Sequence, residues 1–362
     1  MLTIASALYR TAKRILTTIL PPVLFSLSPT LFAHGAGIEE PLKPALELHE
    51  AGKVKEAIAL YDKFIKANPK NAEGYFNRGN AYYDLGQNDL AVRDYSEVIK
   101  LNPKDSEAYY NRGNAYRHLR KDALALKDYD AAIKLAPDDS RSLINRASLH
   151  FDARRYDQAV QDYTEVLRIE PQNAAARYNR ANSLFALGKT QDAIKDYDEA
   201  IRVDGKLVDA YYNRGIAYAE SEKYDEAIRD FDDAIRLNPK HAEAYYNRGL
   251  ARAKTGKREA AIDDYSEAIR LNPKDPEAPF NRALAYMHLE RYEYAARDLS
   301  EVIRIQPNNA EAHIYRGVIR IYQGKDKDAE ADFQRAFQLK PQLKAKVQPV
   351  INDAKAKAKA KS

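Results

Sequence analysis

The side chains that could do metal or acid–base chemistry are scattered along the sequence. No two of the seven histidines have the spacing of metal ligands. The chain has no cysteine, which excludes disulfides, thiol nucleophiles and zinc–thiolate sites. It also has no glycine-rich phosphate loop, and no nucleophile lies in a pattern with a general base. We therefore expect no catalytic site, no metal and no cofactor, and we do not expect an enzyme.

One polar side chain does recur at a fixed interval of 34 residues. The asparagine column consists of Asn77, Asn111, Asn145, Asn179, Asn213, Asn247 and Asn281. A primary amide offers both a donor and an acceptor, so a column of amides could bind the backbone of an extended peptide whatever its side chains. The alternative is that these amides bond to neighbouring helices, and the sequence leaves both interpretations open.

The same interval runs through most of the chain. The phrase YYNRGNAY at Tyr109–Tyr116 returns nearly unchanged at three other places. Nine units without insertion begin at residues 38, 72, 106, 140, 174, 208, 242, 276 and 310, and the array is predicted to occupy residues 36–343. Counted within a unit, position 20 is alanine in all nine, and position 32 is proline in all but the fifth, which has Gly205. A repeat of this length indicates a solenoid.

Each unit has the pattern of two helices. In the third unit, Tyr109 and Tyr116 belong to a first set of apolar residues with helical spacing, and a second set follows a polar turn. Pro137 ends the second helix because it has no N–H group and clashes with the preceding turn. The small residues Gly113 and Ala125 would let the two helices approach closely.

These positions resemble the tetratricopeptide repeat family. The family pattern has an aromatic at position 4, Gly or Ala at 8, Tyr at 11, Ala at 20, an aromatic at 24, Ala at 27 and Pro at 32. The third unit supplies Tyr109, Gly113, Tyr116, Ala125, Tyr129, Ala132 and Pro137. The resemblance implies an all-α fold, a right-handed superhelical solenoid of antiparallel helix pairs. It also implies a concave groove that binds a protein or peptide partner.

Two charged positions depart from the family pattern together. Position 7, usually leucine, is arginine in units two to nine, and position 23 is aspartate in the same eight units. Unit one has neither residue. Residues that are gained and lost together are expected to touch, and an arginine in a packed helix interface needs a carboxylate partner. We predict an Arg–Asp pair between the two helices of each unit. The alternative is an arginine ladder that faces a ligand.

The resemblance places positions 2, 5, 6, 9, 12 and 13 of each first helix on the concave side. In units six to nine, positions 5, 9 and 12 are apolar. The predicted partner-binding residues are therefore the asparagine column together with Tyr212, Ile216, Tyr246, Leu250, Phe280, Leu284, Met287, Ile314 and Val318. An apolar surface inside a groove is typical of a partner site. The alternative is that these side chains pack on the next repeat.

The first 35 residues have the layout of a signal peptide. Basic residues in Arg10–Arg14 precede an apolar run, Ile15–Ala33, and a small-x-small site follows. Pro21 and Pro22 disfavour a stable membrane-spanning helix. We expect export to the periplasm or beyond, with no membrane span after cleavage. The alternatives are an uncleaved membrane anchor, an organelle transit peptide or a cytoplasmic protein.

Net charge is +5, but it comes from the two ends. The region between them holds 49 basic and 52 acidic residues, so no nucleic-acid partner is expected. Residues 344–362 are predicted to form a capping helix, in which Val347, Val350 and Ile351 cover the last unit, and a Lys/Ala-rich tail. The sequence thus predicts a non-enzymatic interaction scaffold. The alternatives are a self-association module that forms homo-oligomers, or a non-catalytic subunit of a transferase or secretion complex.

Overall fold

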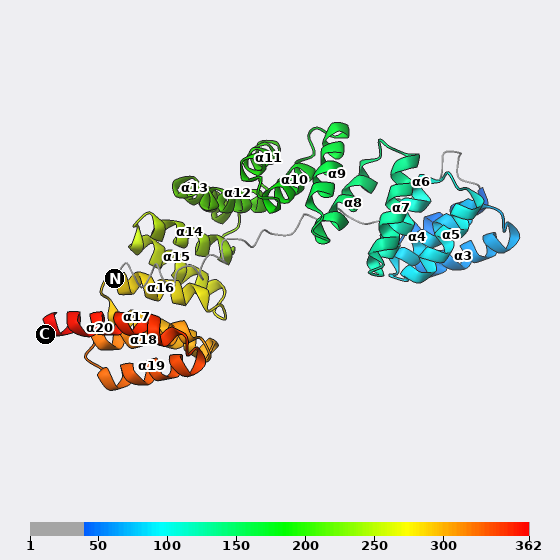
Figure 1. The fold of residues 1–362 in the computed structure, drawn as a ribbon. Coiled ribbons are helices and arrows are strands. Elements are labelled where there is room, and N and C mark those ends of the chain that lie inside the picture. The colour runs from blue at the N-terminus through cyan, green and yellow to red at the C-terminus, as the bar shows by residue number, and fades with distance from the viewer. Residues whose placement is uncertain (1–39, 362) are drawn as a thin grey trace. The chain divides into compact units, whose positions relative to one another are not determined.

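The computed structural model describes residues 40–361, and over this range the chain is helical without a strand (Figure 1). The all-α fold is confirmed. The predicted signal peptide, residues 1–35, lies outside the described residues. The helices form two compact units, residues 40–203 and 204–361, which divide in the turn that contains Gly205.

Within each of these two parts, consecutive helices pair antiparallel (Figure 1). The helices of residues 40–203 are η2 (Glu40–Leu42), α2 (Lys43–Glu50), α3 (Val54–Ala67), α4 (Ala72–Asp84), α5 (Asn88–Leu101), α6 (Ser106–His118), α7 (Asp122–Leu135), α8 (Ser140–Asp152), α9 (Tyr156–Ile169), α10 (Ala174–Ala186) and α11 (Thr190–Val203). Those of residues 204–361 are α12 (Val208–Glu220), α13 (Tyr224–Leu237), α14 (Ala242–Lys254), α15 (Arg258–Leu271), α16 (Glu277–His288), α17 (Tyr292–Ile305), α18 (Ala310–Tyr322), α19 (Asp326–Leu339) and α20 (Leu343–Lys361).

A side-chain cap fixes where most first helices begin. The last residue of a unit accepts a hydrogen bond from a backbone N–H of the next first turn, as when Asp105 Oδ1 accepts from the Ala108 N–H at 2.9 Å. Asn71, Asp139, Asn173 and Asn309 play the same part. These caps satisfy backbone donors that have no partner inside the helix. The proline two residues before the cap ends the preceding helix, and the cap residue begins the next one. The two residues together therefore fix the boundary between consecutive repeats.

The turn between the two helices of a unit needs a left-handed residue at position 15. Five units supply glycine there, as at Gly188 with φ 76°. The other four place Arg120, Arg154, Glu222 and Glu290 at φ between 56° and 59°. A residue with a Cβ atom is strained in this conformation. The turn geometry is therefore maintained by the packed helices even where the local sequence disfavours it.

The two helices of a unit cross where position 8 meets the ring at position 24. A Cβ atom on Gly113 would lie 2.8 Å from Cε1 of Tyr129, and one on Gly215 would lie 2.8 Å from Cε1 of Phe231. These separations are shorter than van der Waals contact, so a larger residue would overpack the crossing. The predicted need for a small residue here is confirmed.

The first and the eighth unit differ from the others at their first helix. The sequence repeat begins at residue 38, but the α-helix begins only at Lys43, after a 3-10 turn. Proline at 41 and at 44 explains the short helix, because neither residue can donate to a helical ladder. Helix α16 begins one residue late, directly after Pro276.

Helix α20 covers the last repeat. Val347, Ile351 and Ala354 are buried in one cluster with Ile314, Val318 and Ile321 of α18. Of the residues predicted to cover the last unit, Val347 and Ile351 are each 3% exposed, and Val350 is partly buried against the same cluster. The opposite face of α20 is polar and exposed, and it includes Gln348, Asn352 and Lys355.

Candidate functional site

The predicted Arg–Asp pairs are present in all eight repeats that carry both residues, so this prediction is confirmed. Arg112 donates from Nε and Nη2 to the two carboxylate oxygens of Asp128, at 2.7 and 2.8 Å. The equivalent pairs are Arg78–Asp94, Arg146–Asp162, Arg180–Asp196, Arg214–Asp230, Arg248–Asp264, Arg282–Asp298 and Arg316–Asp332. Burial raises the pKa of Asp128, and the arginine lowers it in part. The bidentate contact holds a buried carboxylate in place.

The same arginines reach back to the preceding repeat. Nη1 of Arg146 donates to Asp130 at 2.7 Å, and Nη1 of Arg112 donates to the Ser96 hydroxyl at 3.0 Å. For seven of the eight arginines the observed acceptor is position 25 of the preceding repeat: Asp62, Ser96, Asp130, Thr164, Asp232, Ser266 and Ser300. Most guanidinium donors are thus used inside the array, which favours a structural role over a ligand-facing ladder.

Tyrosine rings complete the surroundings of these arginines. The Arg112 guanidinium carbon lies 5.6 Å from the centroid of the Tyr109 ring and 5.8 Å from that of Tyr116. Both tyrosines belong to the opening phrase of the repeat, at positions 4 and 11. Such cation–π contacts stabilise a guanidinium that has lost part of its hydration. The residues that recur in the repeated phrase YYNRGNAY therefore mainly pack inside the array.

The asparagine column is buried, with exposed fractions between 0 and 8%. In residues 40–203 its amides bond along the array. Asn111 donates to Asn80 Oδ1 at 3.3 Å, and Asn145 donates to Asn114 Oδ1 at 2.9 Å. Asn80 Oδ1 also accepts from the Tyr95 hydroxyl at 2.7 Å. These amides therefore join neighbouring first helices.

The column has a different partner in residues 204–361. Asn247 donates to the Tyr212 hydroxyl at 2.9 Å, and Asn281 donates to the Tyr246 hydroxyl at 3.0 Å. These bonds again run from one first helix to the previous one. They agree with the alternative that the amides bond to neighbouring helices. A role of the amides in partner binding stays a prediction, and it requires neighbouring helices to part at the amide.

The predicted apolar stripe divides into two groups. Most of its members are buried, namely Tyr212, Ile216, Tyr246, Met287, Ile314 and Val318. The remaining three are partly exposed, and we define them as the first-helix surface: Leu250 of α14 with Phe280 and Leu284 of α16. Among these buried residues, Tyr246 and Met287 lie in clusters with residues of the next first helix, and Ile314 and Val318 pack against α20. Contact of any stripe residue with a partner stays a prediction.

Sequence reasoning missed a row of carboxylates beside this surface. Each first helix of residues 204–343 carries an acid in its first turn, and we call the four together the acidic edge: Asp209, Glu243, Glu277 and Glu311. Burial raises the pKa of Asp209 and of Glu277, and for Glu277 the neighbouring Asp275 and Glu311 add to the rise. Their spacing of 34 residues is the signal that could have revealed the row.

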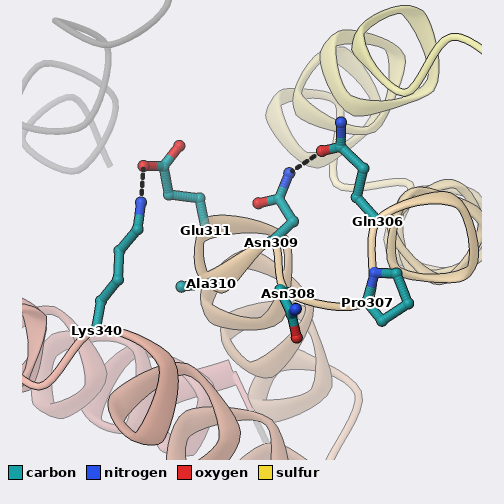
Figure 2. A pocket seen from close by; sticks show the side chains of 7 residues that line it. All are labelled: Gln306, Pro307, Asn308, Asn309, Ala310, Glu311 and Lys340. Atoms are coloured by element: carbon teal, nitrogen blue, oxygen red, sulfur yellow. Dashed lines mark hydrogen bonds and ion pairs between the residues drawn. The ribbon is translucent and has the colours of Figure 1, made fainter.

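A cavity of about 480 Å³ lies at the turn between α17 and α18. Gln306, Pro307, Asn309 and Glu311 line it, with Lys340 at its edge (Figure 2). Lys340 points toward Glu311, and their charged atoms are 3.6 Å apart. The polar side chains that line the cavity already have partners in the protein, because Glu311 pairs with Lys340 and Asn309 caps α18.

Within residues 40–361, no three His, Asp or Glu side chains gather closely enough to hold a metal ion. Over the same range, none of the helices combines the length and the apolar character that a bilayer crossing needs.

Family comparisons match the array in several blocks. A tetratricopeptide repeat model matches residues 144–206, 212–279 and 280–343, which is more than half of the chain. A TPR repeat model matches residues 45–86 and 79–119, and a further tetratricopeptide repeat model matches residues 106–139. A comparison with curated proteins finds no match.

Several solved structures match this chain. The C-terminal part of a TPR repeat-containing protein from Cytophaga hutchinsonii matches with a TM-score of 0.51 and 17% identity, over 75% of this chain and 97% of that chain. YrrB, described as a TPR protein with an unusual peptide-binding site, matches with a TM-score of 0.47 and 25% identity, over 51% of this chain and 94% of that one. MamA from Desulfovibrio magneticus RS-1 has a TM-score of 0.45 and 22% identity, over 47% and 96%.

The family models agree with the paired helices, the position-8 crossings and the 34-residue spacing. The chain belongs to the tetratricopeptide repeat family.

Proposed function

We propose that the protein is a non-enzymatic interaction scaffold that binds a helix or extended segment of a partner protein on the first-helix surface. One observation carries this proposal. Leu250, Phe280 and Leu284 stay partly exposed on neighbouring first helices, whereas the equivalent residues Ile216, Ile314 and Val318 are buried. Apolar side chains left open in adjacent repeats are typical of a partner site.

The three side chains are held in place by the core beneath them. Phe280 packs edge-to-face on Tyr315, with ring centroids 5.5 Å apart, and Leu284 packs against the cluster that contains Met287. Leu250 packs against the cluster of Tyr246 and Tyr265. A surface that is already ordered loses little side-chain entropy when a partner binds. This arrangement suits an anchor site for two or three apolar partner residues.

The test begins with a partner peptide selected on the purified full chain from a displayed peptide library. Its affinity is then measured by calorimetry for the parent and for the double variant Leu250→Asp/Leu284→Asp. We expect the double variant to lose at least about tenfold in affinity, because a carboxylate would be buried against the ligand. Circular dichroism checks that helix content is kept.

A matched control uses Leu124→Asp, because Leu124 is an exposed leucine on the second helix α7 with 44% of its surface accessible. This variant should bind as the parent does. Full binding by the double variant contradicts the proposal, and a concentration-dependent mass without peptide binding favours self-association instead. Loss of helix content in the double variant would mean that these leucines are core residues.

We also propose that the chain is exported, on the basic and apolar pattern of residues 1–35. Expression in a bacterial host, fractionation and sequencing of the mature amino end test this. A new start near Ala36 in the periplasmic fraction supports export. An intact Met1 in the cytosol contradicts it.

A further inference from the structure

The acidic edge and the first-helix surface share helix faces. Glu277, Phe280 and Leu284 stand three and seven residues apart on α16, and Glu243 and Leu250 stand seven apart on α14. Residues at these spacings lie on one side of a helix. A partner that covers the apolar side chains therefore also meets the carboxylates at the start of the same helices.

Helix dipoles alone do not explain the acidic edge. A carboxylate in a first turn does stabilise a helix, because the amino end carries partial positive charge. Of the first helices in residues 40–203, α4 and α6 carry Glu73 and Glu107 in their first turns, whereas α8 and α10 have no acid there. The repeat can be built without the acid, and among the described residues a run of four consecutive first-turn acids occurs in residues 204–343.

The charges around the acidic edge leave it negative at its centre. Glu311 has a cation nearby, since Lys340 Nζ is 3.6 Å from it. For Glu243 the cation-forming group observed among the described residues is the ring of His241, whose Nδ1 lies 3.2 Å away and also accepts from the Ala244 N–H. Glu277 is influenced chiefly by burial and by other acids, which raise its pKa. The electrostatic field at Glu277 therefore favours an incoming cation.

A buried acceptor lies in the same region. Asn247 is 2% exposed, and its Nδ2 donates to the Tyr212 hydroxyl. Its Oδ1 has no hydrogen-bond partner among the described residues. The same oxygen of Asn77 and of Asn111 also has no partner among the described residues, so this feature belongs to the asparagine column as a whole and does not mark the acidic edge.

Helix α20 covers the last repeat, and its contacts show which side chains can pack against a first helix of this array. On α18, the apolar residues Ile314 and Val318 are buried beneath Val347 and Ile351 of α20. The acid at the start of the same helix, Glu311, faces a lysine from the turn that leads into α20 (Figure 2). Apolar cover and a lysine thus occur together at repeat nine.

We infer that the partner of the first-helix surface is a cationic amphipathic segment, whose apolar side chains cover Leu250, Phe280 and Leu284 while Lys or Arg side chains meet Glu243 and Glu277. This inference rests on the proposed function and names the class of partner. The net charge of the whole chain is +5, so a basic segment is not attracted by overall charge and has to be recognised locally.

The probes are two synthetic helical peptides of about 18 residues, long enough to cross several repeats. They share one Leu/Ala stripe, and one carries lysines beside it where the other carries glutamates. Fluorescence anisotropy with the full chain gives both affinities. We expect the lysine peptide to bind at least about tenfold more tightly, and Glu243→Gln/Glu277→Gln to weaken it about tenfold.

The matched control is Glu226→Gln/Glu293→Gln, which removes first-turn acids from the second helices α13 and α17. The control should bind the lysine peptide as the parent does. Equal affinity for both peptides, or no effect of Glu243→Gln/Glu277→Gln, overturns the inference.

The variant Leu250→Asp/Leu284→Asp separates this inference from the proposed function. If it abolishes binding of both peptides and the parent binds them equally, the surface binds partners but has no preference for cations. If the lysine peptide binds it as tightly as the parent, the apolar surface is not the site and both proposals are wrong. Absence of binding by either peptide to the parent also contradicts both.

Discussion

Arg146 holds two carboxylates at once, Asp162 of its own repeat and Asp130 of the preceding one. Its Nε and Nη2 donate to Asp162 at 2.9 and 2.6 Å, and its Nη1 donates to Asp130 at 2.7 Å. The Asp162 side chain is 8% exposed and that of Asp130 is 62% exposed. The inner pair therefore joins the two helices of a repeat, and the outer bond joins two repeats.

We expect Arg146→Leu to destabilise the protein by about 3–5 kcal/mol, because Asp162 would be left buried without its partner. The double variant Arg146→Leu/Asp162→Leu should recover much of this loss, since two apolar residues can pack where the pair was. Urea unfolding of the parent, the single and the double variant measures both effects. An equally low midpoint for the two variants would show that the pair itself supplies the stability.

The outer bond can be tuned at position 25. Thr164 accepts from Arg180 Nη1 at 3.1 Å, where Asp130 and Asp232 offer a carboxylate to the equivalent arginines. We expect Thr164→Asp to raise the free energy of unfolding by about 0.5 kcal/mol, the usual size for an exposed ion pair. Thermal unfolding at low and high salt measures it, and the gain should shrink in high salt. Asp130→Thr is the reciprocal variant and should lose a similar amount.

The strained turns offer a second route to higher stability. Glu222 has φ 59° at a position that is glycine in five other repeats. We expect Glu222→Gly to stabilise the protein by about 0.5–1 kcal/mol, because relief of the left-handed strain outweighs the larger entropy of the unfolded glycine. Urea unfolding provides the measurement. Gly256→Ala, at φ 80°, is the inverse change and should destabilise by a similar amount.

Damage to the capping helix should stay local. Ile351→Asp would bury a carboxylate against Ile314 and Val318, so we expect α20 to detach. Hydrogen exchange should then become faster in α18, α19 and α20 and stay unchanged in α4–α7, because each repeat is stabilised mainly by its neighbours. Asn352→Asp alters an exposed neighbour and should change neither region. Faster exchange throughout would show that the array unfolds as one cooperative block.

The elements were well predicted from the sequence because each feature recurs in eight or nine units. Helix pairs, the small residue facing the position-24 ring, and the Arg–Asp pair all follow from positions that repeat or disappear together. The outer arginine bond was not predicted, because its acceptor varies between Asp62, Ser96 and Thr164 and no single residue type marks it.

The candidate site was less predictable for a physical reason. Spacing places Ile216 and Leu250 on equivalent helix faces, but the sequence does not show that Ile216 is buried and Leu250 is partly exposed, because burial depends on packing in three dimensions. An amide likewise has the same hydrogen-bonding groups whether it meets a peptide or a tyrosine hydroxyl. The partners of Asn145 and Asn247 therefore became apparent only in three dimensions.

In seven repeats the outer arginine bond joins position 7 to position 25 of the preceding repeat, so one such junction can replace another. If residues 140–173 were removed, Arg180 would stand 34 residues closer to the amino end and would face Asp130, which now binds Arg146. Its bond to Asp196 would be kept. Duplication or loss of a whole repeat could thus lengthen or shorten this scaffold while the same arginine contact between neighbouring repeats is kept.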